Sequence, residues 1–206
     1  NSYGGRILRV DLSKEEISFQ ETKAYADRWI GGRAINTWIC LDEMAPEVEW
    51  NSPESLLCFG VGVLLEHWHP EPEGFPLNEE RFNGGIGSSN VGGFWGTELK
   101  YAGFDHIVVK GKAKQPVFLF ISDKEVRILD ASNLKGKTTW ETEAAIRERF
   151  GDERIRVTSI GPAGENLVKS ACIICDRASA AGGSGCGAVM EIEEQPSELQ
   201  SRQVIS

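Results

Sequence analysis

Residues 84–93 of this 206-residue chain have the composition of a loop that binds an anion. Five glycines are interspersed there with short or polar residues, among them Ser89 and Asn90. Glycine adopts positive φ angles readily and lets other groups come close to the backbone, and successive N–H groups in such a loop can form a concave site for phosphate. Phe94 and Trp95 follow as an apolar anchor, and residues 177–187 form a second glycine-rich run.

Cysteine and histidine pairs elsewhere could bind a metal. Cys172 and Cys175 have CxxC spacing, but they fall in an apolar strand, where positions three apart point to opposite faces. No second CxxC accompanies them, so we expect buried thiols. His67 and His69 share one side of an extended segment, but without an evident third ligand a surface loop is preferred over a transition-metal site. Cys186 lies between glycines and is either a reactive thiol or a packed side chain, with packing expected.

Three other titratable residues follow the first glycine-rich segment. His106 alternates with aliphatic residues, so we expect it to face a partner or water from a strand. Glu98 and Asp105 could form an acid–base pair, but we expect both to have structural roles.

A fold of short strands and few helices must position these residues. The sequence predicts hairpins at 6–20 and 116–130, strands at 56–65, 104–109, 156–160 and 168–174, and a loop at 66–80. It predicts helices at 24–30, 34–44, 97–102 and 138–150, the second with Ile35, Trp38, Ile39 and Leu41 on its apolar side. Strands arranged as hairpins with a few helices indicate an α+β fold and not a parallel βαβ sheet.

Charge and composition restrict the function classes. The length suits one domain with its own core. A net charge of −9 at pH 7 opposes binding to nucleic acid or to an anionic membrane surface. No apolar run is long enough to span a bilayer, and the start of the chain lacks a signal-peptide pattern. The five cysteines are an odd number in a chain too long for a disulfide scaffold, so a reducing cytoplasm is expected.

Five segments carry a family resemblance in a fixed order along the chain. They are YGGRILRVDLSKEEI at 3–17, NVGGFWGTELKYAGFDHIVVKGKAKQPVFLFI at 90–121, LDASNLKGKTTWETEAAIRERFG at 129–151, SIGPAGENLVKSACI at 159–173, and DRASAAGG with GAVM within 176–190. Together they resemble the N-terminal domain of the aldehyde ferredoxin oxidoreductases. The likeness extends over nearly the whole chain up to Met190, which makes it more specific than any single glycine pattern.

The resemblance implies an α+β domain of two similar halves of mainly antiparallel sheet, forming a saddle for a tungsten or molybdenum bis-pyranopterin cofactor. Asn90, Val91, Gly92 and Gly93 match the loop that meets the pterin phosphates and their magnesium ion, and Arg81 matches an arginine that precedes it. Gly183, Ser184 and Gly185 match the second cofactor loop. The implied reaction is oxidation of an aldehyde to a carboxylate, with electrons passing through an iron–sulfur cluster to ferredoxin. If this holds, the loops around Asn90 and Gly185 must lie close together in the fold.

Several positions depart from the family pattern. Gly183 stands where an arginine is expected and Ser184 where a glycine is expected. Residues 62–67 replace the usual G-P-L-T-G-T, and the segment from Arg81 to Asn90 is shorter than usual. Two interpretations therefore stay open. The chain is either the cofactor-binding part of such an enzyme or a degenerate paralogue that acts as a structural or assembly subunit without cofactor.

The resemblance also implies partners. We expect residues 1–190 to form the domain and the polar residues 191–206 to form a tail. In the family, helical domains beyond this one carry the iron–sulfur ligands and the catalytic groups, so no cluster ligands are expected here. The expected partners are that helical remainder or a partner chain, and ferredoxin. The six tryptophans, together with a face that those domains would cover, lead us to expect a homo- or hetero-oligomer.

Overall fold

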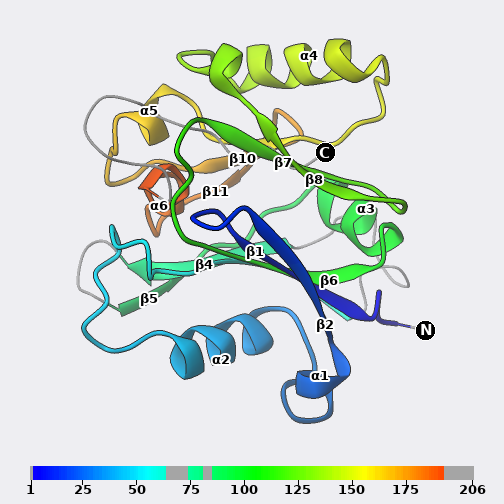
Figure 1. Ribbon diagram of the computed structural model, residues 1–206, viewed down its shortest axis with the longest axis vertical. Helices are drawn as coiled ribbons and strands as arrows, with labels where there is room; N and C mark the ends of the chain where they lie inside the picture. The colour runs from blue at the N-terminus through cyan, green and yellow to red at the C-terminus, as the bar shows by residue number, and fades with distance from the viewer. Residues whose placement is uncertain (1, 64–73, 81–84, 193–206) are drawn as a thin grey trace.

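The computed structural model of the chain describes residues 2–63, 74–80 and 85–192, with residues 74–80 and Ile192 described by their backbone alone (Figure 1). The strands are β1 (Arg6–Asp11), β2 (Glu16–Glu21), β3 (Leu57–Val61), β4 (Gly74–Glu80), β5 (Gly85–Ser88), β6 (Phe104–Lys110), β7 (Val117–Ile121), β8 (Val126–Asp130), β9 (Thr158–Ser159), β10 (Ile173–Cys175) and β11 (Ser179–Ala181). The helices are α1 (Lys23–Trp29), α2 (Arg33–Glu43), α3 (Trp95–Tyr101), α4 (Thr139–Phe150), α5 (Pro162–Glu165) and α6 (Cys186–Ile192), with a 3-10 turn at Ser132–Leu134.

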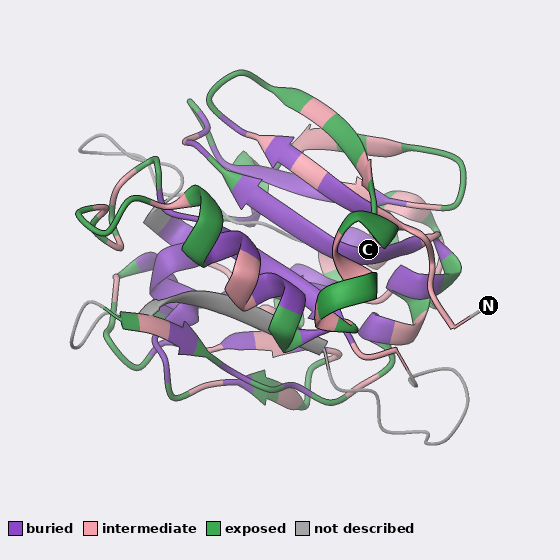
Figure 2. Cartoon of the chain, turned by 90° about the horizontal axis from the view of Figure 1, so that it is seen from below, coloured by how far each residue is buried: buried purple, intermediate pink, exposed green. Residues whose placement is uncertain are grey.

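A six-stranded sheet forms the centre of the fold, in the order β2-β1-β6-β3-β4-β5. Its pairs are antiparallel except for β1 and β6, which run parallel. In β6 every residue from Phe104 to Val109 is buried, because both faces of this strand are covered. Figure 2 shows the buried strands in purple, while exposed residues lie in loops, on outer helix faces and on strands such as β2, β5 and β8.

Helix α2 covers one face of this sheet. Ile35 and Ile39 lie one helical turn apart and pack with Ile7 and Val108 of the sheet. Leu41 was expected on the same apolar side, but 62% of its surface is exposed. Successive helix residues are about 100° apart, so Leu41 points away from Ile39.

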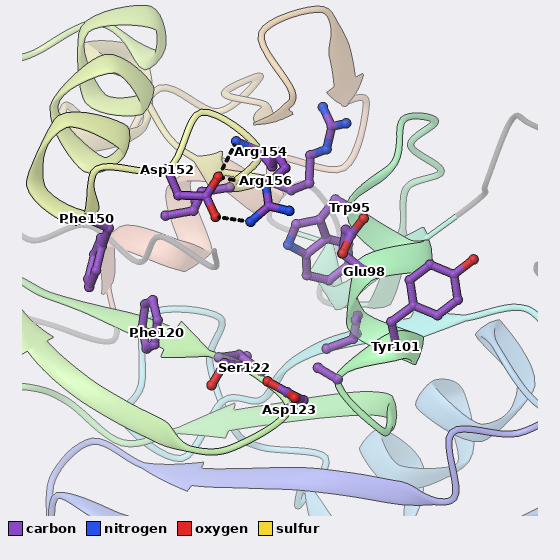
Figure 3. Close-up of a pocket in the computed structure, with 14 residues that line it drawn as sticks. Trp95, Glu98, Tyr101, Phe120, Ser122, Asp123, Phe150, Asp152, Arg154 and Arg156 are labelled. Atoms are coloured by element: carbon purple, nitrogen blue, oxygen red, sulfur yellow. Dashed lines mark hydrogen bonds and ion pairs between the residues drawn. The ribbon is translucent and has the colours of Figure 1, made fainter.

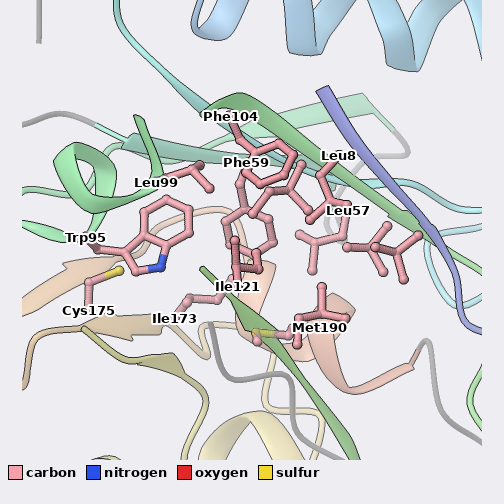
Figure 4. Close-up of a cluster of buried hydrophobic side chains, with 14 of the residues drawn as sticks. Leu8, Leu57, Phe59, Trp95, Leu99, Phe104, Ile121, Ile173, Cys175 and Met190 are labelled. Carbon is pink, nitrogen blue, oxygen red and sulfur yellow. The ribbon is translucent and has the colours of Figure 1, made fainter. Parts of the chain in front are cut away.

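The second β layer covers the other face. It contains the sheet β11-β10-β9 and the hairpin β7-β8. The core between the layers includes Phe59 and Trp95 on one side and Ile121, Ile173 and Met190 on the other (Figure 4). Helix α4 closes the outside of this layer, giving four layers in the order helix, sheet, sheet, helix (Figure 1).

Local sequence explains why α4 forms where it was predicted. The Thr138 hydroxyl accepts from the Glu141 amide while the Glu141 carboxylate accepts from the Thr138 amide, which is a capping box. Gly151 ends the helix in the left-handed conformation at φ 66°. The α+β class with mainly antiparallel sheets and a few helices is confirmed.

The structure corrects several expected boundaries. Residues 74–80, expected within a loop, form β4, because their backbone pairs with β3 on one side and β5 on the other. The rest of that expected loop, 66–73, lies outside the described residues. The strand expected at 156–160 shortens to β9, and the strand expected at 168–174 becomes the shorter β10, which begins at Ile173 and ends one residue beyond the expected range. Helix α6 includes Glu191, the first residue of the expected tail, while 193–206 lie outside the description, so the domain boundary stays a prediction. Within the described residues, no helix has the length and apolarity that crossing a bilayer requires.

Candidate functional site

The two glycine-rich loops lie in contact, as the sequence predicted. The hydroxyl of Ser89, in the first loop, donates to the carbonyl oxygen of Gly182 at 2.8 Å and lies 2.6 Å from the hydroxyl of Ser184. Because the single Ser89 proton goes to Gly182, Ser184 is the donor between the two hydroxyls. Both serine side chains are buried, so this network fixes residues 89–93 against residues 182–185. We call these two segments the paired loops.

Glycine is required at two turns of the paired loops. Gly93 has φ +106°, and a Cβ there would come within 2.9 Å of the Asp176 carboxylate. Gly183 has φ +91°, is exposed, and has open space where a Cβ would point. The position where an arginine was expected therefore projects no side chain towards a ligand, but it leaves its backbone open to one.

Asp176 connects the start of the second glycine-rich run to the end of the first. Its Oδ2 atom accepts a 2.9 Å hydrogen bond from the backbone amide of Phe94. Its Oδ1 atom is buried and has no hydrogen-bond partner among the described residues. The backbone of Asp176 is left-handed, at φ 49°, which a non-glycine residue adopts only when its surroundings hold it there. An orphaned carboxylate oxygen beside a glycine turn is a suitable ligand for a hard cation such as Mg²⁺.

Arg33 is a site residue that sequence reasoning missed. It is the first residue of α2, and its guanidinium donates to the side-chain oxygen of Asn90. Both residues are exposed. Arg33 lies 57 residues before Asn90, and the only local signal is the pair Gly31-Gly32 that opens the helix.

Arg177 has a different role. Its Nε atom lies 2.9 Å from a carboxylate oxygen of Glu143 on α4, and its guanidinium lies 5.8 Å from the ring centre of Trp140. Glu143 is buried and also pairs with Arg147 at 2.8 Å. Arg177 therefore anchors the start of the second glycine-rich run to α4.

The other predicted site residues fall into three groups. Val91 is buried in the core between the layers, so it anchors the first loop by packing. Gly92 is exposed beside Gly93, and Gly185, with φ +73°, is buried next to Ser184. Arg81 lies outside the described residues, as do His67 and His69.

The cysteines behave as packed thiols. Burial raises the pKa of Cys175 to about 12, and it also raises the pKa of Cys186, whose thiol lies 3.1 Å from the Ala181 carbonyl oxygen. Packing of Cys186 and burial of Cys175 are thus confirmed, while Cys172 is only partly buried. Among the described residues, no three His, Cys, Asp or Glu side chains gather as a metal site.

His106 faces a partner from strand β6, which is one of the two expected alternatives. Its side chain is fully buried, and its Nδ1 atom lies 2.7 Å from the side-chain oxygen of Asn36, so it does not face water. Gly60 provides the room, since a Cβ there would lie 2.6 Å from that Nδ1. Burial lowers the pKa of His106 to about 4, so the ring is neutral and Nδ1 donates.

Asp105 has the expected structural role. Its carboxylate accepts from the amides of Gly4 and Gly5, at 2.8 and 2.7 Å, and from the Thr22 hydroxyl at 2.7 Å. It thereby fixes the N-terminal segment to β6. Glu98 is exposed on α3.

A cavity of about 630 Å³ opens between α3, the end of β7 and the loop after α4 (Figure 3). Trp95, Phe120 and Phe150 give it apolar walls. At its rim Arg154 donates hydrogen bonds to Asp152, which lower the pKa of that carboxyl to about 2. This ion pair satisfies Arg154, and Glu98 and Asp123 add negative charge to the lining, so the paired loops remain the better candidate for an anion.

Comparison with known proteins agrees with this geometry. The sequence model of the family "Aldehyde ferredoxin oxidoreductase, N-terminal domain" matches residues 7–193. The chain is similar to the tungsten-containing aldehyde ferredoxin oxidoreductase of Pyrococcus furiosus, with 44% identity over 188 residues that cover 90% of this chain and 31% of the relative. The corresponding protein of Pyrococcus abyssi is 42% identical over 193 residues, covering 91% of this chain and 31% of the relative.

Two further similar proteins have other activities in their names. The aliphatic sulfonate oxidoreductase WOR-like subunit of Pyrococcus furiosus is 33% identical, with 92% of this chain and 33% of the relative covered. The structure of the active site complex BamBC of benzoyl coenzyme A reductase, in complex with 1,5 dienoyl-CoA, is 37% identical with a TM-score of 0.91. That match covers 98% of this chain and 30% of the other. The chain thus spans about a third of the length of the proteins that it matches.

Proposed function

Because the chain belongs to the aldehyde ferredoxin oxidoreductase family as its N-terminal domain, we propose that its paired loops hold the phosphate-bearing end of a tungsten or molybdenum bis-pyranopterin cofactor. The observation that carries the proposal is the contact between Ser89 and Ser184, which brings the two glycine loops to one place. The relatives at 42–44% identity are named as tungsten-containing, which favours tungsten over molybdenum.

The residues of the paired loops fit such a group. Exposed glycines at 92 and 183 offer backbone to phosphate oxygens. Arg33 offers a guanidinium, which binds phosphate with strong charge-assisted hydrogen bonds. Asn90 and the orphaned oxygen of Asp176 offer ligands for a magnesium ion between the phosphates. Arg81 is proposed as a further contact on the grounds of resemblance alone.

The bound cofactor would supply the redox chemistry, the oxidation of an aldehyde to a carboxylate with two electrons passing to ferredoxin. The role of this chain is to bind the cofactor and to orient it. The buried serine network holds the loops in one relative position, and Asp176 fixes the Gly93–Phe94 turn that faces the second run. A fixed position of the cofactor's phosphates fixes the position of its other end.

The aldehyde is the weaker part of the proposal. Relatives with three different named activities share this segment, so its common role is cofactor binding and not substrate choice. Aldehyde oxidation is favoured because the aldehyde enzymes are 42–44% identical, against 33% and 37% for the other two.

Partners follow from the length of the relatives. We propose that the iron–sulfur cluster and the catalytic groups lie in a helical portion that completes the enzyme, in the same polypeptide or in a partner chain. Exposed apolar side chains support an interface of this kind, including Ile30 at 71% and Tyr101 at 65% exposure. Ferredoxin as the electron acceptor, a homo- or hetero-oligomeric state and a cytoplasmic location stay predictions.

The alternative, a degenerate subunit without cofactor, rests on Gly183 and Ser184. It is less favoured, because identity to tungsten enzymes extends over nine-tenths of the chain. Full-length enzyme purified without oxygen decides between the two. Tungsten by mass spectrometry and pterin fluorescence after oxidation should appear together, with two pterins for each tungsten as a bis-pyranopterin requires. A complete enzyme that contains neither metal nor pterin would contradict the proposal.

A further inference from the structure

The turn at Ile30, between α1 and α2, combines backbone strain with an exposed apolar side chain. Ile30 has φ 64° and ψ −69°, and 71% of its surface is exposed. A β-branched residue at positive φ is strained, and such strain persists only where the surroundings hold the backbone in place. An isoleucine that faces only water gains no burial in return for this strain, so its presence calls for a contact with another surface.

Two hydrogen bonds and one close contact fix this turn. The Gly31 amide donates to the Trp29 carbonyl oxygen at 2.8 Å, and the Tyr3 hydroxyl donates to the Ile30 carbonyl oxygen at 2.6 Å. Gly31 lies against Val63, since a Cβ at Gly31 would come within 2.7 Å of the Val63 side chain. The turn therefore presents Ile30 on a rigid backbone, and a rigid anchor loses little conformational entropy on binding.

Aromatic and cationic side chains lie next to the turn. Trp29 and Trp38 stack with their ring centres 4.9 Å apart, and the guanidinium of Arg28 lies 5.0 and 5.3 Å from these two centres. Both tryptophans are only partly buried. Tryptophan and arginine are enriched among the residues that carry the binding energy of protein interfaces. We call Arg28, Trp29, Ile30 and Trp38 the turn patch.

The turn patch lies on the layer that borders the first paired loop. Helices α1 and α2 form the outer layer on their side of the central sheet (Figure 1). Trp29 packs on the buried cluster of this layer, and so does Ile86 of β5. Ser89, where the first paired loop begins, directly follows β5. A surface that encloses a ligand of the paired loops from this side would therefore meet the turn patch.

The length of the relatives indicates what covers this patch. The match to the Pyrococcus furiosus enzyme covers 31% of that protein, so about two-thirds of a complete enzyme lies outside this chain. A cofactor on the paired loops is shielded from water only if that remainder covers their surroundings. Resting on the proposed function, we infer that the turn patch docks into an apolar pocket on the remainder of the enzyme, with Ile30 as the anchor.

A second copy of this chain is the competing occupant. A two-fold dimer would bring the same patch together from both copies. Two protruding turns would then meet, whereas a protruding aliphatic side chain packs well only in a recess. The cavity beside α3 and a second cavity between Glu43 and Glu54 include no residue of the turn patch. The remainder of the enzyme is therefore the favoured occupant.

The test uses the complete enzyme, with any partner chain that co-purifies, isolated without oxygen. An aliphatic diazirine amino acid replaces Ile30 or, as a control, Leu41, which is 62% exposed within the regular helix α2. Illumination links the diazirine carbon to whatever lies next to it, and mass spectrometry of the digest identifies the linked peptide. Thermal unfolding of each variant checks that the fold is retained.

We expect position 30 to link to a peptide from outside residues 1–206, and position 41 to react mainly with water. Tungsten and pterin are also followed during dialysis of I30A and of L41A, the matched truncation of an exposed aliphatic residue. I30A should lose both roughly fivefold faster than wild type, the factor for truncating a residue that anchors an interface. A looser interface opens the cofactor to solvent, whereas L41A should match wild type.

Three results would overturn the inference. Position 30 could link only to water, or to a peptide within residues 1–206 of the same or a second copy. I30A could retain tungsten and pterin as wild type does, or L41A could lose them as fast as I30A, and in either case Ile30 is not the anchor. The proposed function is tested separately. If wild type contains neither tungsten nor pterin while position 30 still links to the remainder, the docking stands and the proposed function fails.

Discussion

The serine network between the paired loops makes a prediction whose size follows from its geometry. Ser89 donates a part-buried hydrogen bond to Gly182 and accepts a buried one from Ser184, besides a long contact from the Cys186 thiol. Ser89→Ala would leave the part-buried carbonyl oxygen of Gly182 and the buried hydroxyl of Ser184 without this partner. A buried polar group that loses its partner costs about 1–3 kcal/mol, so S89A should destabilise the protein by about 2–4 kcal/mol.

Ser184→Ala should cost less. It removes the bond between the hydroxyls but leaves the one from Ser89 to Gly182, so about 1–2 kcal/mol is expected. The double variant S89A/S184A removes the shared bond only once. Its cost should therefore fall short of the sum of the single costs by about 1 kcal/mol, as for other directly bonded pairs.

Urea unfolding without oxygen measures these free energies, with Ser88→Ala as the control. Ser88 is the exposed neighbour of Ser89, so S88A should change stability by no more than about 0.5 kcal/mol. Two results would refute the reasoning, namely equal costs for S89A and S184A, or strict additivity in the double variant. In the full-length enzyme S89A should also lose tungsten faster than S88A.

Three further changes test other parts of the structure by urea unfolding. As pH falls from 6.5 towards 4, His106 is protonated in the unfolded chain but stays neutral in the folded chain, so the free energy of unfolding should drop by about 3 kcal/mol in total. H106Q should lack this pH-dependent drop. If its pH profile matches that of wild type, the burial argument is wrong. Asp176→Ala should cost about 2 kcal/mol because it removes the hydrogen bond from the Phe94 amide. D176N should cost less, because asparagine tolerates the left-handed backbone. Equal costs for the two variants would count against this explanation. Glu143→Ala should cost about 3 kcal/mol because it leaves Arg147 and Arg177 without their buried partner. R177A should cost clearly less, since the side chain of Arg177 is 40% exposed. A larger cost for R177A than for E143A would refute the assignment of Glu143 as the buried carboxylate that holds both arginines.

Elements with strong local signals could be predicted from the sequence. Helix α4 has its capping box at Thr138 and Glu141 and its terminal Gly151, and the β7-β8 hairpin surrounds Asp123-Lys124. Strand β4 could not be predicted, because the signal is its backbone pairing with β3 and β5, which are set by the fold as a whole. The position of Leu41 was predictable from helix geometry and was assigned to the wrong face.

The candidate site also has features that the sequence could predict and features that it could not. Glycine spacing located both loops, and the family resemblance predicted that they meet. The arginine contributed by α2 lies far away in sequence and follows no pattern that a single chain reveals. For His106 the sequence left a partner and water open, because the room for its ring comes from Gly60 on the neighbouring strand, which alternation along β6 does not report.

The sequence separation of the serine contact has a consequence for biosynthesis. Ser89 and Ser184 are 95 residues apart in the chain. If the paired loops hold the cofactor as proposed, a ribosome-bound chain lacks one of the two loops until almost this entire segment has emerged and folded. On that proposal the cofactor would bind after this segment has folded, because only the folded segment brings Ser89 and Ser184 together.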